Sequence, residues 1–98
     1  MTVTIDSVLV QDSEPTTASL DGGAILLSLR AGSYFNFNAV ATEIWTMLAA
    51  PCRVGRIFDA LSEDHDVDAE TLRRDVTPFL QTLLEQHLVR LVEPGDAP

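Results

Sequence analysis

The chain has 98 residues, enough for one domain, and 46% of them are hydrophobic. Fifteen acidic residues against six arginines, with no lysine, give a formal net charge of -9, which repels phosphate backbones. One cysteine excludes an internal disulfide, and the sequence lacks both a secretory signal pattern and a run of about 18 apolar residues. We therefore expect one soluble, cytoplasmic domain over residues 1–98, with no nucleic-acid or membrane partner.

The first third of the chain predicts antiparallel strands. Residues 1–15 alternate only weakly between apolar and polar and are expected to form an arm or an edge strand, whereas residues 93–98 should form a flexible tail. Two β-prone runs flank the turn tripeptide Asp21-Gly22-Gly23, which is typical of a hairpin, and a third run follows a second reversal. These three strands are expected over residues 16–20, 24–29 and 33–37.

Alternation within the strands predicts which side chains share a face. In the second strand, one face carries Ile25, Leu27 and Leu29. In the third strand, Phe35 and Phe37 lie on one side, and Tyr34 and Asn36 lie on the other.

Apolar residues at helical spacing predict three helices after the strands, over residues 39–50, 53–63 and 69–87. Asn38 and Asp68 are suitable N-caps, Pro51 should end the first helix, and Pro78 should kink the third. The only tryptophan, Trp45, belongs to the first helix and is expected in the core. Residues 88–92 are expected to return as a short strand or to pack against the core.

Residues that commonly carry chemistry are few in this sequence. Cys52, His65 and His87 lack the spacing of a nucleophile with its base or of a metal site. The acidic stretch from Asp64 resembles a calcium-binding loop, but Ala69 stands where that loop requires glycine. We therefore expect that the protein is not an enzyme and that it binds no cofactor and no metal.

Strands followed by three helices also describe a winged helix-turn-helix, which usually binds DNA. The third helix offers Arg73 and Arg74 against Glu70, Asp75 and Glu85, so its charge disfavours phosphate contacts. A DNA-binding regulator is kept as the alternative function, beside a small enzyme and a structural subunit. An edge at the third strand would instead offer unpaired N–H and C=O groups to an extended peptide.

Four motifs resemble the PqqD-like family, the recognition elements for precursors of ribosomally made, modified peptides (RiPPs). They are LDGGAILL at residues 20–27, GSYFNFN at 32–38, Ile44-Trp45, and the closing Leu83-Leu84 with Leu88-Val89. The sequence is most similar to the stand-alone leader-binding proteins of lasso-peptide clusters.

This resemblance implies an α+β, winged helix-turn-helix-like fold, with a three-stranded antiparallel sheet followed by three helices. It implies a non-catalytic domain that binds the leader of a precursor peptide by strand addition. The domain would then present the precursor to a biosynthetic enzyme, such as a leader peptidase or a radical enzyme. By position, the peptide-binding residues would be Ser33, Tyr34, Phe35, Asn36 and Phe37 on the third strand, and Arg73, Val76, Thr77 and Leu80 on the third helix.

Overall fold

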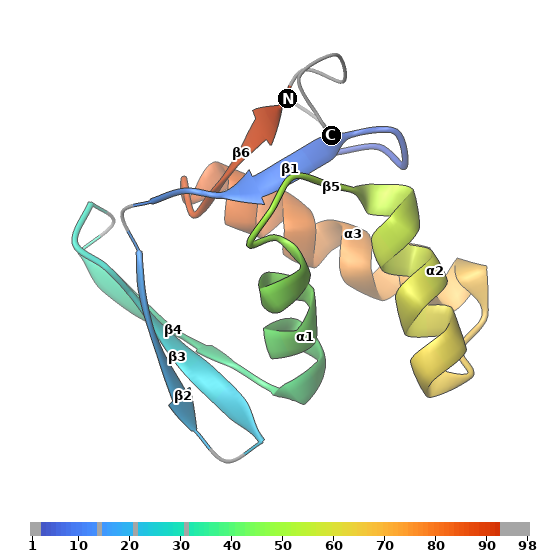
Figure 1. The fold of residues 1–98 in the computed structure, drawn as a ribbon, viewed down its shortest axis with the longest axis horizontal. Coiled ribbons are helices and arrows are strands. Elements are labelled where there is room, and N and C mark those ends of the chain that lie inside the picture. The colour runs from blue at the N-terminus through green and yellow to red at the C-terminus, as the bar shows by residue number, and fades with distance from the viewer. Residues whose placement is uncertain (1–2, 14, 21, 31, 93–98) are drawn as a thin grey trace.

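A computed structural model describes residues 3–13, 15–20, 22–30 and 32–92 of the chain. These residues form two antiparallel three-stranded sheets and three helices, an α+β fold (Figure 1). In chain order the elements are β1 (Val8–Gln11), β2 (Thr16–Leu20), β3 (Gly23–Ser28), β4 (Ser33–Phe37), α1 (Ala39–Met47), β5 (Cys52–Arg53), α2 (Val54–His65), α3 (Ala69–Glu85) and β6 (Val89–Val92). The predicted sheet followed by three helices is confirmed, and a second sheet accompanies it.

The predicted sheet has the order β2-β3-β4, so sequence neighbours pair throughout. Gly22 has φ +75, a left-handed conformation that glycine adopts without steric cost in the tight turn between β2 and β3. Gly23 matters for a different reason, because a Cβ there would collide with the backbone carbonyl oxygen of Phe37. The start of β3 therefore lies against the end of β4.

The face of β3 that is buried is not the one that was predicted from its largest apolar residues. Ala24, Leu26 and Ser28 are buried under α1, whereas Leu27 and Leu29 are exposed. In β4 the expected alternation is confirmed, with Phe37 buried, Phe35 half-buried, and Tyr34 and Asn36 exposed. Of the apolar face predicted for the second strand, Ile25 is half-buried and Leu27 is exposed, and Leu29 lies in the turn after β3.

The second sheet has the order β5-β1-β6 and lies over the helices (Figure 1). The N-terminal strand was expected as an arm or an edge strand; β1 is instead the central strand of this sheet. Its partners are distant in the chain, since Val8 pairs with both Arg53 and Val92. Of the residues 88–92, Val89–Val92 form the strand β6, and the predicted tail at 93–98 lies outside the described residues.

The helices begin at the predicted caps. The Asn38 side-chain oxygen accepts the Ala41 N–H at 2.8 Å, and the Asp68 carboxylate accepts the Thr71 N–H at 2.7 Å. Satisfying these otherwise unpaired donors stabilises the first turn of each helix. The first helix ends at Met47, three residues before the predicted limit, and the third ends at Glu85 instead of residue 87.

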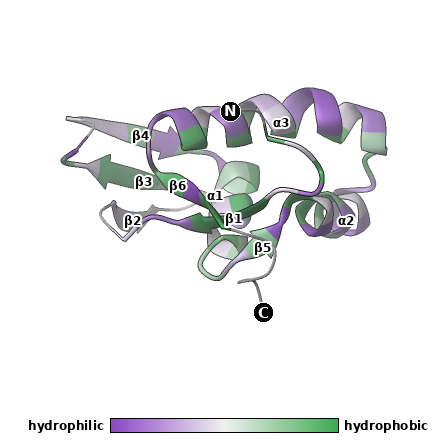
Figure 2. Ribbon diagram, turned by 90° about the horizontal axis from the view of Figure 1, so that it is seen from above, coloured by the Kyte–Doolittle hydropathy of each residue, from purple (hydrophilic) through white to green (hydrophobic). Residues whose placement is uncertain are grey.

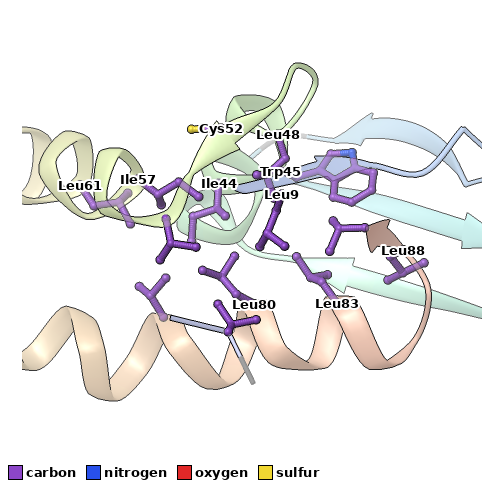
Figure 3. Packing of buried hydrophobic residues seen from close by; sticks show 14 of the residues in the cluster. Leu9, Ile44, Trp45, Leu48, Cys52, Ile57, Leu61, Leu80, Leu83 and Leu88 are labelled. Carbon is purple, nitrogen blue, oxygen red and sulfur yellow. The ribbon is translucent and has the colours of Figure 1, made fainter. Parts of the chain in front are cut away.

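A single cluster of buried side chains joins α1, α2, α3, β1, β3 and β6 (Figure 3). Trp45 is 4% exposed within it, and its ring stands edge-on to Phe37, with the ring centroids 5.9 Å apart. The indole N–H donates to the Thr17 hydroxyl at 3.1 Å, which satisfies its one polar group. Burial of this kind agrees with the structural role expected for Trp45.

Candidate functional site

β4 is an edge strand, because β3 pairs with one of its sides and no other strand of the described residues pairs with the second. Figure 2 shows β4 as the strand of its sheet that lies nearest α3, with β2 on the far side of β3. An edge strand with free N–H and C=O groups can accept another extended chain as its neighbour. The free side of β4 is therefore the first component of the candidate site.

The register shows which β4 groups point to this free side. Leu20 and Gly23 flank a two-residue turn, and such flanking residues form a hydrogen-bonded pair. The direction of the backbone hydrogen bonds alternates along a strand. Gly23 bonds toward β2, so Ala24 bonds toward β4, where its partner is Phe37. The same alternation directs the N–H and C=O groups of Tyr34 and Asn36 away from β3, to the free side.

A groove lies between α1 and α3, beyond the end of β4. Its first part is a hollow of about 290 Å³ lined by Asn38, Val40, Ala41, Ile44, Asp75, Val76 and Phe79. A second hollow of about 310 Å³ shares Val40, Asp75 and Val76 with the first and continues toward the end of α2. We call these two hollows together the α1–α3 groove. Its walls are mainly apolar, and Asp75 carries a negative charge at the point where the hollows meet.

The residues expected at the site from the third helix separate into three places. Val76 lines the α1–α3 groove but is only 5% exposed, and Leu80 is fully buried in the core. Arg73 and Thr77 lie on the opposite flank of α3, where they line a hollow of about 230 Å³ with Val3, Thr4, Ile5 and Phe58. The structure therefore does not bring Arg73 and Thr77 together with β4.

The N-terminal segment occupies the flank of α3 that carries Arg73 and Thr77. The backbone N–H of Val3 donates to the side-chain oxygen of Gln81 at 2.9 Å, which fixes the segment on that flank of α3. Asp75 and Phe79 line the α1–α3 groove on the other flank, and they were not among the residues predicted for the site. Phe79 packs edge-on against Phe37 at 5.5 Å between ring centroids, so it connects α3 to the end of β4. The apolar stripe of α3 includes Phe79, but a helix sequence does not show which border of its stripe faces the sheet.

Two titratable side chains that could carry chemistry have structural explanations: His65, which lines the second hollow of the groove, and Cys52, which does not line it. His65 Nε2 lies 2.7 Å from the Glu43 carboxylate, and hydrogen bonds with His65 and then Asp64 lower the pKa of Glu43. Burial raises the pKa of the Cys52 thiol, which keeps it in the unreactive neutral form. Among the residues that the structure describes, no three histidine, cysteine or acidic side chains are grouped as metal ligands. Within the same residues, no helix has both the length and the apolar character needed to cross a membrane.

A small α+β domain with a free strand edge next to a helix-lined groove is the class of protein that these features define. The chain belongs to the PqqD family, since the family model described as coenzyme PQQ synthesis protein D (PqqD) matches residues 23–89. The matched segment runs from the start of β3 to the start of β6 and includes both β4 and the groove. The family resemblance drawn from the sequence motifs is thereby confirmed.

A solved structure is similar to this chain over most of its length. It is TbiB1 in complex with the TbiA(beta) leader peptide, with 32% sequence identity and a TM-score of 0.74. The match covers 82% of this chain and 93% of that chain. A search of curated proteins found no significant match.

Proposed function

We propose that this protein is a non-catalytic recognition element that binds the leader segment of a ribosomally made precursor peptide. The observation that carries the proposal is the free side of β4 beside the α1–α3 groove, in a chain 32% identical to a protein whose structure holds a leader peptide. The net charge of -9 disfavours the DNA-binding alternative. We place this activity in the cytoplasm, where precursor peptides are synthesised.

The leader would bind as a fourth strand of the β2-β3-β4 sheet. The outward N–H and C=O groups of Tyr34 and Asn36 supply two donors and two acceptors for its backbone, and these bonds require no particular side chain in the peptide. Ser33, Phe35 and Phe37 extend the strand, but their own backbone groups bond toward β3. Backbone pairing therefore contributes affinity but no selectivity for the sequence of the leader.

Selectivity would come from the α1–α3 groove. An antiparallel leader enters the sheet next to the end of β4, and the residues preceding the paired segment then lie along the groove. Apolar leader side chains fit between Val40, Val76 and Phe79, while Asp75 favours a neutral or basic neighbour over an acidic one. Arg73 and Thr77, on the far flank of α3, take no part in this arrangement.

The bound precursor would then be delivered to a biosynthetic enzyme, such as a leader peptidase or a radical enzyme. A domain with no chemistry of its own contributes to catalysis by raising the local concentration of substrate at its partner. Leader binding and enzyme binding must therefore use different surfaces of the domain.

Titration of the labelled protein with a synthetic leader, followed by NMR and calorimetry, tests the proposal. The leader should come from the precursor gene next to the gene for this protein, and a scrambled leader serves as the control. We expect a dissociation constant of roughly 1 μM or lower, with amide shifts concentrated in β4 and around the groove. Absence of heat and of shifts with the cognate leader would disprove the function.

A further inference from the structure

The β2-β3-β4 sheet has an exposed apolar face that the leader-binding site does not use. α1 lies against one face of the sheet, and among the described residues no helix or strand lies against the other (Figure 1). The register aligns two rows of outward side chains across the three strands. We call these rows the outer face: Thr16, Leu27 and Tyr34 in one row, and Ala18, Ile25 and Asn36 in the other.

The outer face is uncharged, and Leu27, Ile25 and Ala18 give it an apolar centre. Leu27 is 47% exposed and Tyr34 66% exposed, and they are directly opposite each other, so their side chains form one continuous patch. Leu29, in the turn after β3, is 82% exposed. None of the six outer-face residues carries a charge, although the whole chain has a net charge of -9. Contiguous apolar surface of this kind on a small domain marks an interaction site.

Charge restricts what can cover this face. A second copy would bring two chains of net charge -9 together, and nucleic acids or anionic membranes carry the same sign. A protein with an apolar centre and a basic rim would be attracted by the acidic domain and would bury the patch. Such a protein is complementary to this domain in both charge and hydrophobicity, and it is therefore the favoured occupant of the outer face.

The position of the outer face connects it to the proposed function. A leader added beside β4 becomes part of the same sheet, and its alternate side chains then extend the outer face next to Tyr34 and Asn36. A protein docked on this face would therefore contact the domain and the bound leader together. We propose, on the basis of the leader-binding function, that the outer face docks the enzyme that processes the precursor, through an apolar surface with a basic rim.

The test compares Leu27→Lys with Ile5→Lys. Ile5 is 49% exposed but lies in the hollow beside Arg73 and Thr77, so both variants replace a half-exposed apolar residue and change the net charge equally. The probes are the purified peptidase or radical enzyme from the neighbouring genes and the synthetic leader. Leu29→Lys, in the turn that follows β3 and two residues after Leu27, is a second variant in case Leu27→Lys unfolds.

We expect Leu27→Lys or Leu29→Lys to weaken enzyme binding by roughly tenfold or more, and Ile5→Lys to leave it unchanged. All folded variants should bind the leader as the unmodified protein does, which separates this proposal from the leader-binding function. Unchanged enzyme affinity, no binding by any of the enzymes, or a parallel loss of leader affinity would each overturn the docking proposal. A dimer that the outer-face variants convert to a monomer would overturn it too, because a second copy would then be the occupant.

Discussion

Replacing Trp45 by alanine should remove the largest single contribution to the core. Burying an indole removes roughly 200 Å² from water, and at about 25 cal/mol per Å² this contributes about 5 kcal/mol as an upper bound. Trp45 is 4% exposed and contacts Phe37, so nearly all of that area is lost in the variant. We expect Trp45→Ala to lower the free energy of unfolding by about 3–5 kcal/mol, close to the total stability of a small domain.

Urea denaturation followed by circular dichroism measures this change. Tyr34→Ala is the control, because its ring is 66% exposed and its loss should change stability by less than about 1 kcal/mol. Thr17→Val separates the hydrogen bond from the packing, since it leaves the indole N–H without its acceptor and should cost about 1 kcal/mol. A Trp45→Ala protein of near-native stability that had lost leader binding would refute the reasoning and would place Trp45 in the binding site.

Three further variants test other parts of the account. Gly23→Ala pushes a Cβ against the Phe37 carbonyl and should separate β3 from β4, lowering both the melting temperature and leader affinity. Glu43 has a lowered pKa, so its carboxylate stabilises the fold above the pKa of the unfolded chain, and this stabilisation is lost as the pH falls through the pKa of the folded protein. Glu43→Gln should therefore cost less than ~1 kcal/mol at neutral pH, and the difference should vanish in acid; a constant difference would contradict the assignment. Asp75→Arg should obstruct the groove and weaken leader binding, whereas Thr77→Arg on the far flank should not; calorimetry measures both affinities.

Local signals in the sequence were sufficient to predict the elements that form between neighbours in the chain. The turn at Gly22, the caps Asn38 and Asp68, and helical periodicity depend on interactions within a few residues. The β5-β1-β6 sheet could not be predicted in this way, because Val8 pairs with Val92 at the other end of the chain.

The periodicity of the sequence also did not decide which face of β3 is buried. Both alternating sets in β3 are apolar, with Ala24 and Leu26 on one face and Ile25 and Leu27 on the other, so alternation does not select the buried face. The choice follows from packing against α1, since the face that carries Ala24 and Leu26 is the buried one. The same holds for the candidate site. The sequence predicted that β4 is an edge strand, but it did not predict which side of α3 lines the groove next to it.

The most direct test of the central claim uses the two edges of one sheet. The alternation that directs the Asn36 N–H to the free side of β4 also directs the Ser19 N–H to the free side of β2. Proline at either position removes one outward donor and spares the ladder within the sheet, so both variants should remain folded. We predict that Asn36→Pro weakens leader binding by roughly tenfold or more in calorimetry, whereas Ser19→Pro binds as the unmodified protein does. Unchanged affinity in a folded Asn36→Pro protein, or a loss confined to Ser19→Pro, would show that the leader does not add to β4.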